Sequence, residues 1–169
     1  TLCQVCLLLY QRGYVVSNDG NVSVRIGEDQ VLITPSGVSK GRLTPDMLVV
    51  CDLEGRVLAG HLHPSSESAM HLLVYRERPD VGAVVHAHPP AATAFSICRR
   101  PLAQHYLTET ISGLGEVPVA PFALPSTSQI PDSLRPYVAG CNGALLANHG
   151  AIAWGRDLWH AFDRMEQVE

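Results

Sequence analysis

The sequence lacks the long apolar runs and the blocks of like charge that mark membrane-spanning and nucleic-acid-binding proteins. No run approaches the roughly 18 apolar residues of a transmembrane helix, and no basic segment with a small-residue cleavage site opens the chain. Twelve Lys and Arg stand against sixteen Asp and Glu, so the formal net charge is −4 with neutral histidine. We therefore expect a cytoplasmic protein with neither a nucleic acid nor a membrane as partner.

Cysteine is also scarce and unpaired in its spacing. The five cysteines are odd in number and scattered, which argues against a disulfide framework, and the CxxC of Cys3 and Cys6 has no second pair to complete a metal site. We expect reduced, packed thiols. A chain of 169 residues with 46% hydrophobic residues can bury roughly 70% of its unfolded surface. One domain over residues 1–169 is therefore expected, with further sequence beyond both ends.

Apolar spacing and turn residues predict an α/β protein. Helical periodicity precedes Gly13 and returns after residue 157, and Ser65 or Ser66 is expected to cap a helix that ends near Arg78. Short turns between strands favour a mostly antiparallel or mixed sheet with helices on its faces. The expected strands are 21–26, 31–34, 48–52, 56–59, 81–88, 117–120, 144–147 and 151–154, and the other expected helices are 91–97 and 130–139.

Two histidines close the most apolar of these strands. Side chains two residues apart on a strand project from the same face, so His86 and His88 are expected to point to one place. Two imidazoles on a strand end are a common half of a transition-metal site. A hydrogen-bonded histidine pair explains the same pattern equally well.

Two further residues can complete such a site. His149 lies at the mouth of another apolar strand, before Gly150, where it is either a third imidazole ligand or an ordinary turn residue. Glu67 lies in the expected first turn of a helix, where the dipole favours an anion. It is either a ligand or a capping carboxylate.

Three small polar turns, at 20–23, 34–37 and 65–66, offer hydroxyl, amide and backbone N–H groups. Such groups can hold a phosphate without a positive patch. Each turn is also explained by chain reversal alone.

The ordered series GNVS (20–23), ITPSG (33–37), PSSE (64–67), VVHAHP (84–89) and NHG (148–150) resembles the class II, metal-dependent aldolase and adducin family. The resemblance runs from about residue 13 to residue 154. It implies a three-layer α/β/α sandwich around a mostly antiparallel sheet. It also implies a Zn²⁺ ion, or Mn²⁺, Fe²⁺ or Co²⁺, and a homotetramer with active sites at subunit interfaces. The implied metal ligands are His86, His88, His149 and Glu67, and the implied phosphate-binding residues are Asn21, Ser36, Gly37, Ser65 and Ser66.

The resemblance further implies an aldolase that cleaves a phosphorylated ketose of the fuculose-1-phosphate kind through a metal-stabilised enediolate. Glu67, displaced from the metal by substrate, would move a proton at the third carbon. Tyr106, donated by a neighbouring subunit, would exchange a proton on the aldehyde oxygen. The alternatives are a sugar-phosphate 4-epimerase, whose motif carries Asp in place of Glu67, a methylthioribulose-phosphate dehydratase, a decarboxylating relative, and a non-catalytic adducin-like interaction module. His71 receives no role, and the identity of the sugar stays open.

Overall fold

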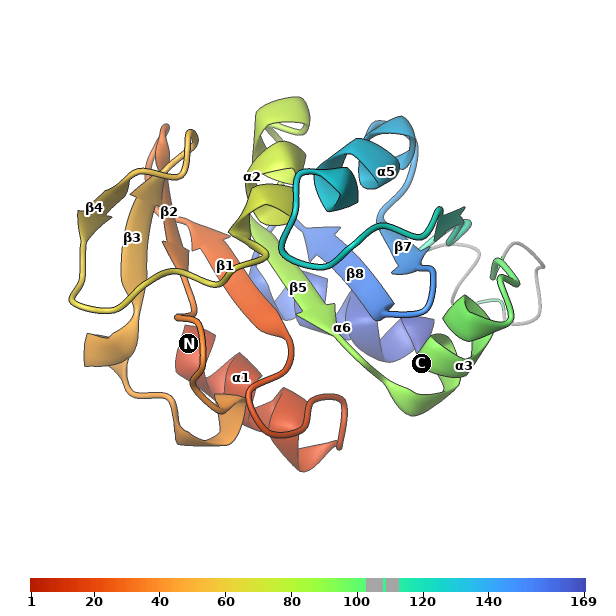
Figure 1. The fold of residues 1–169 in the computed structure, drawn as a ribbon, viewed down its shortest axis with the longest axis horizontal. Helices are drawn as coiled ribbons and strands as arrows, with labels where there is room; N and C mark the ends of the chain where they lie inside the picture. The colour runs from red at the N-terminus through yellow and green to blue at the C-terminus, as the bar shows by residue number, and fades with distance from the viewer. Residues whose placement is uncertain (103–107, 109–112) are drawn as a thin grey trace.

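The computed structural model describes residues 1–102, 108 and 113–169 of the chain. Within them, an eight-stranded sheet forms the middle layer (Figure 1). Its strands are β1 (Asn21–Arg25), β2 (Gln30–Ile33), β3 (Val49–Asp52), β4 (Val57–Ala59), β5 (Ala83–Ala87), β6 (Val119–Ala120), β7 (Gly143–Leu146) and β8 (Gly150–Gly155). They lie in the order β4-β3-β2-β1-β5-β8-β7-β6. Neighbouring strands are antiparallel except β6 and β7, which run parallel.

Helices cover both faces of this sheet. The α-helices are α1 (Leu2–Gln11), α2 (Ser68–Glu77), α3 (Pro90–Ile97), α5 (Gln129–Val138) and α6 (Leu158–Val168), and the short 3₁₀ helices are η1 (Lys40–Arg42) and η2 (Pro45–Met47). Apolar side chains of α1 and α6 form one core with the sheet, and those of α2 and α5 form the other. The three-layer α/β/α sandwich is therefore confirmed.

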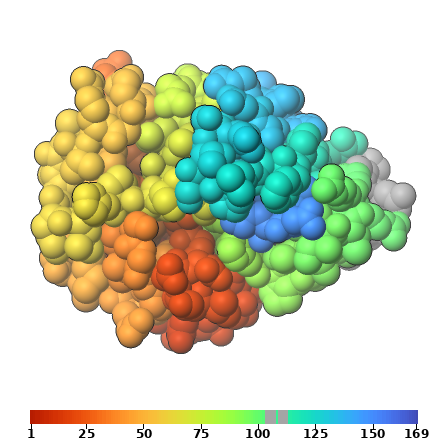
Figure 2. Space-filling view, viewed as in Figure 1, coloured from red at the N-terminus to blue at the C-terminus, as the bar shows by residue number. Residues whose placement is uncertain are grey.

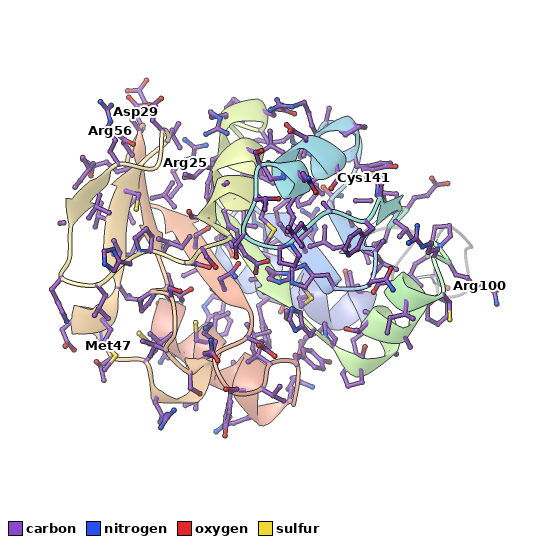
Figure 3. All side chains as sticks on the ribbon, viewed as in Figure 1. Arg25, Asp29, Met47, Arg56, Arg100 and Cys141 are labelled. Carbon is purple, nitrogen blue, oxygen red and sulfur yellow. The ribbon has the colours of Figure 1, made fainter. Side chains whose placement is uncertain are left out.

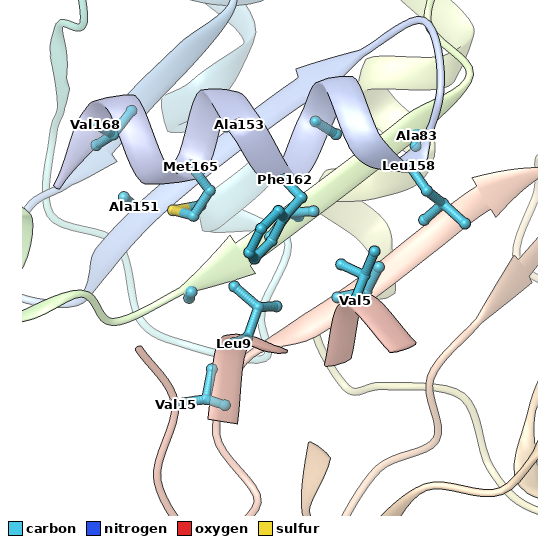
Figure 4. Close-up of a cluster of buried hydrophobic side chains, with 14 of the residues drawn as sticks. Val5, Leu9, Val15, Ala83, Ala151, Ala153, Leu158, Phe162, Met165 and Val168 are labelled. Atoms are coloured by element: carbon cyan, nitrogen blue, oxygen red, sulfur yellow. The ribbon is translucent and has the colours of Figure 1, made fainter. Parts of the chain in front are cut away.

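Strand alternation explains why the central strands are apolar throughout. Along β5, Val85 joins the core under α1 and α6, whereas Val84 joins the core under α2 and α5. On β8, Ala153 joins the core under α1 and α6, and Trp154 joins the core under α2 and α5. Figure 4 shows Phe162 and other side chains of α6 packed between α1 and the sheet. A strand covered on both faces needs apolar residues at every position, because successive side chains point to opposite faces.

One expected helix start is wrong. Neither Ser65 nor Ser66 is the N-cap of α2, because that position is held by Glu67, which makes no side-chain capping bond. The serines belong to a separate turn, in which the Ser68 N–H donates to the Ser65 carbonyl oxygen. The Ser65 hydroxyl accepts from the Glu67 N–H at 3.3 Å. This turn delays the helix and leaves the Glu67 carboxylate free for other partners.

The cysteines form no disulfide: all five are free, and Cys6 and Cys51 are buried as expected of packed thiols. Cys141, labelled in Figure 3 just beyond α5, is partly buried. Cys98 is exposed, so the packing expectation is wrong for that residue. Among the described residues, no helix is both long enough and apolar enough to cross a bilayer.

Candidate active site

Antiparallel pairing brings the three histidines together. His86 lies in β5, and His88 follows the end of that strand, where its N–H donates to the Tyr14 carbonyl oxygen at 2.8 Å. His149 lies in the tight turn between β7 and β8. Because β5 runs antiparallel to β8, with Ala87 opposite Ala151, the end of one strand meets the start of the other. The three ring centroids are consequently only 4.8–5.0 Å apart.

Two glycines permit this close approach. A Cβ on Gly150 would lie 2.6 Å from both the Ala87 carbonyl oxygen and His88 Cδ2. A Cβ on Gly20, whose φ is +69°, would lie 2.8 Å from the His86 carbonyl oxygen. Side chains at either position would push the surrounding loops away from the end of β5. Gly20 and Gly150 therefore serve the packing of the site.

Hydrogen bonding orients His86 toward its histidine neighbours. Its Nδ1 lies 2.9 Å from the Ala151 carbonyl oxygen, which can only accept, so Nδ1 donates this hydrogen bond and Nε2 is the ring nitrogen that faces the other histidines. That Nε2 is 3.2 Å from His88 Nε2. On the other side of its ring, His88 Nδ1 lies 3.6 Å from Asp19 Oδ2. A carboxylate behind an imidazole is a common way of orienting a metal-binding histidine.

The imidazoles of His88 and His149 are neutral near pH 7. Burial, assisted by the neighbouring His86 ring, lowers the pKa of His88 to about 3. The same two causes lower the pKa of His149 to about 4. Both rings therefore offer nitrogen lone pairs at neutral pH, which is the form that binds metal ions.

Glu67 adds a carboxylate to the three rings. Its Oε2 lies 3.3 Å from His86 Nε2 and accepts a 3.0 Å hydrogen bond from Asn21 Nδ2. Its Oε1 lies 3.3 Å from His149 Nε2, yet this buried oxygen has no hydrogen-bond partner among the residues that the structure describes. Burial raises the pKa of Glu67, but the hydrogen bond and charge of His86, followed by His149 and Asn21, outweigh it and hold the pKa well below its usual range. The carboxylate is therefore ionised.

These donors fit a divalent cation. The three histidines offer ligand nitrogens within 4.8 Å of one another. In a tetrahedral site with metal–ligand bonds of about 2.0–2.1 Å, adjacent ligands are about 3.3 Å apart. Three distances lie near this value. His86 Nε2 is 3.2 Å from His88 Nε2 and 3.3 Å from Glu67 Oε2. His149 Nε2 is 3.3 Å from Glu67 Oε1. Imidazole and carboxylate ligands suit zinc and accept manganese, iron or cobalt.

A buried chain of hydrogen bonds supports Glu67 from behind. Asn21 Oδ1 accepts from His71 Nε2 at 2.6 Å, and His71 Nδ1 lies 2.7 Å from the Ser23 hydroxyl. The Tyr75 hydroxyl lies 2.8 Å from the same serine oxygen. Glu67, His71 and Tyr75 follow one another at four-residue spacing, so one face of α2 meets the side chains of β1. The sequence prediction missed His71, whose only signal is this spacing from Glu67.

A polar pocket of about 210 Å³ opens beside the histidines. It contains every residue that the resemblance assigns to phosphate binding, together with Glu67, His88 and His149. In Figure 2 the segments that contribute to it, red, orange, yellow and cyan, converge near the middle of this face. Asn21 has only one amide N–H left for a ligand, because its other polar contacts go to Glu67 and His71. The lining residues that the sequence prediction missed include Asp19, Lys40 and Ser126.

The remaining predicted site residue, Tyr106, lies outside the described residues. Its place relative to the histidines therefore stays a prediction.

Comparison with known proteins identifies the family. The protein-family model described as Class II Aldolase and Adducin N-terminal domain matches residues 1–169 of this chain. A 3-oxo-tetronate 4-phosphate decarboxylase from Haemophilus influenzae is 36% identical over 168 residues, covering 95% of this chain and 78% of that protein. An L-fuculose phosphate aldolase from Methanococcus maripaludis is 35% identical over 172 residues, covering 98% and 89%. A solved structure of L-fuculose 1-phosphate aldolase matches with a TM-score of 0.92 and 33% identity, covering 99% and 79%. The chain belongs to the class II aldolase and adducin family.

Proposed function

We propose that this protein is a metal-dependent aldolase that cleaves a phosphorylated ketose. The observation that carries the proposal is the convergence of three imidazoles and the ionised Glu67 at one end of a polar pocket. A purely structural cluster would not leave Glu67 Oε1 buried without a hydrogen bond, since such an atom costs about 1–3 kcal/mol. The relatives named for sugar-phosphate cleavage support the choice of substrate class.

The proposed reaction breaks the bond between the third and fourth carbons of the ketose. The hydroxyl proton on the fourth carbon leaves, that carbon becomes an aldehyde, and the electron pair of the broken bond stays on the fragment that carries the ketone. A bound divalent cation, held by His86, His88, His149 and Glu67, would supply Lewis-acid stabilisation of this negative charge. Protonation of the third carbon completes the balance and gives a three-carbon ketone phosphate.

Glu67 is the proposed carrier of the proton at the third carbon. Asn21 holds one of its oxygens, while the unpartnered Oε1 is available to exchange a proton. Tyr106 is the proposed acid and base at the oxygen of the fourth carbon. It would come from a neighbouring subunit of a homotetramer.

The small polar turns are the proposed phosphate site. Ser36, Gly37, Ser65 and Ser66 line the pocket, and Asn21 keeps one N–H for the same purpose. Holding the phosphate would place the reacting carbons against the histidines, so that binding energy remote from the reaction lowers its barrier.

Decarboxylation of a phosphorylated 3-oxo acid is the second candidate. The relative from Haemophilus influenzae that bears this activity in its name is 36% identical to the chain. Loss of carbon dioxide, like aldol cleavage, leaves an electron pair beside a carbonyl group and then needs a proton, so the same residues can serve both reactions. The epimerase, the dehydratase and the non-catalytic module remain as further alternatives.

A product screen tests the proposal. The zinc-loaded protein is incubated with ketose 1-phosphates and with phosphorylated 3-oxo acids, and released aldehyde and carbon dioxide are measured separately. Aldehyde with a ketone phosphate is the expected result. Carbon dioxide alone favours the second candidate, whereas full turnover by metal-free protein ends the metal-dependent mechanism. Light scattering during gel filtration tests the homotetramer, and the cytoplasmic location stays a prediction.

A further inference from the structure

Lys40 is a buried cation at the edge of the candidate substrate pocket. It lies in η1, only 2% of its surface is exposed, and it contributes to the pocket lining. Its Nζ donates to the Asn18 carbonyl oxygen at 3.0 Å and to the Val38 carbonyl oxygen at 2.8 Å. Lysine is almost never fully buried without a charged partner, so this position calls for an explanation.

The charge of Lys40 has no close counterion. Among the residues that the structure describes, no carboxylate oxygen forms an ion pair with Nζ. The two carboxylates that line the pocket lie beside the histidines: Asp19 Oδ2 is 3.6 Å from His88 Nδ1, and the Glu67 oxygens are 3.3 Å from His86 Nε2 and His149 Nε2. Burial lowers the pKa of the Lys40 ammonium, while Cys6, Asp19 and Glu67 act on it in the opposite direction. An ammonium held in this way is costly unless an anion joins it.

The contacts of Lys40 place its ammonium between two loops of the pocket. Asn18 belongs to the loop that precedes β1, and Val38 follows the predicted phosphate-binding pair Ser36 and Gly37. An ammonium has three N–H donors, and the two carbonyl oxygens use two of them. One donor is left for a ligand, and Lys40 lines the same pocket as Ser36 and Gly37.

We propose that Lys40 is the charged group that recognises the phosphate of the substrate. This inference rests on the proposed function and names the residue that makes its phosphate site selective. The serine hydroxyls and backbone N–H groups of the turns form hydrogen bonds with a phosphate or with a neutral sugar hydroxyl alike. A lysine adds a point charge, which favours a phosphate dianion over a neutral group.

The test measures binding of a simple phosphate monoester, glycerol phosphate, to the zinc-loaded protein by calorimetry, with glycerol as the neutral probe. Lys40→Gln keeps a side-chain donor for the loop carbonyls but removes the charge, and Lys40→Met removes both. Arg42→Gln is the matched control, because Arg42 lies in the same short helix and does not line the pocket. We expect Lys40→Gln to weaken glycerol phosphate binding at least about 10-fold and Arg42→Gln to change it less than about 2-fold.

Two results would overturn the inference. The first is an unchanged affinity of folded Lys40→Gln for glycerol phosphate, which would mean that Lys40 serves only to connect two loops. The second result applies if neither variant folds. The ¹⁵N resonance of the Lys40 ammonium in the wild-type protein is then followed while glycerol phosphate is added. A shift supports the inference, and the absence of a shift at saturation contradicts it.

This inference and the proposed function can fail separately, because binding of the probe requires no turnover. A protein that binds glycerol phosphate through Lys40 but cleaves no ketose phosphate sustains the inference and ends the aldolase proposal. If the protein cleaves a ketose phosphate and Lys40→Gln leaves KM unchanged, the aldolase proposal stands and the inference about Lys40 fails.

Discussion

The histidine cluster and the polar pocket meet at Glu67 but are built from different parts of the fold. The histidines lie at the ends of β5 and β8, two central strands buried on both faces. The pocket is lined by loops, among them the segments 18–20, 35–37 and 125–126. Strand ends fix the positions of metal ligands within tight limits, whereas loops adapt to a ligand and vary without disturbing the core. On the proposed function, the cluster therefore determines the chemistry and the pocket determines which molecule undergoes it.

The largest effect is expected where the histidine cluster is broken. His88→Ala removes one of three imidazole ligands, so we expect substoichiometric zinc after purification and at least about a 100-fold loss of turnover. Metal content by mass spectrometry and kcat are the measurements. His61→Ala is the control, because His61 is exposed and does not line the pocket. Retention of zinc and activity in His88→Ala would show that the cluster is structural.

Glu67→Gln separates metal binding from proton transfer. Glutamine keeps an oxygen that can accept from Asn21 Nδ2 but cannot exchange a proton as a carboxylate does. Turnover is therefore expected to fall about 10²–10⁴-fold, while the three histidines keep zinc bound. Glu54→Gln, a change at an exposed carboxylate remote from the pocket, should leave both unchanged. Equal turnover in Glu67→Gln and wild type would remove Glu67 from the acid–base role.

The stability of the metal-free protein should depend on pH through His71. Complete burial, followed by the nearby His86, lowers the pKa of His71 to about 3, far below the unfolded value of about 6.5. Between these two pH values His71 binds a proton in the unfolded chain but not in the folded chain. The free energy of unfolding therefore falls as the pH drops below about 6.5. Urea unfolding at pH 7, 5.5 and 4.5 measures this loss, with metal removed by a chelator.

His71→Gln supplies the matched comparison for that titration. Glutamine can still donate to Asn21 Oδ1 and does not titrate, so we expect a shallower dependence of the unfolding free energy on pH. His88 and His149, whose pKa values are also lowered, retain part of the slope. A slope identical to that of the wild type would exclude His71 as a contributor.

The smallest effect is expected in the loop-built pocket. Ser36→Ala removes one hydroxyl from the proposed phosphate site, worth about 0.5–1.5 kcal/mol or about 2–10-fold in KM. Zinc content and kcat should stay near the wild-type values, because the histidine cluster is untouched. Ser128→Ala, which alters an exposed serine that makes no capping hydrogen bond and does not line the pocket, is the control. A loss of zinc in Ser36→Ala would mean that cluster and pocket are not separable.

Much of the architecture could be predicted from local patterns. The strand expected at 21–26 is β1, and the pair expected at 144–147 and 151–154 corresponds to β7 and β8. These elements are short, apolar and bounded by turn residues, so neighbouring residues carry the information. The cap at Ser65 or Ser66 failed because serine favours turns as well as caps. Only the hydrogen bond from the Ser68 N–H to the Ser65 carbonyl oxygen decides between them.

The candidate site also contains residues that could be predicted from the sequence and residues that could not. His86 and His88 could be paired from spacing alone, because side chains two apart on a strand share a face. His71 and Lys40 carry no comparable signal, since one looks like an ordinary helical residue and the other like an exposed lysine. The burial of His71 accompanies contacts with β1, and that of Lys40 accompanies contacts with the adjacent Val38 segment and with the separate loop that contains Asn18.

The amino-acid sequence by itself determined the alternation of helices and strands and the family motifs, because each depends on residues close together in the chain. The set of candidate metal ligands came from the resemblance of those motifs to the family. The tertiary structure decided which atoms face one another. It turned His86 Nε2 toward Glu67, left Glu67 Oε1 without a hydrogen bond, and enclosed Lys40 beside the predicted phosphate turns. Those facts depend on contacts between segments far apart in the chain, as from Glu67 to His149, which no local pattern encodes.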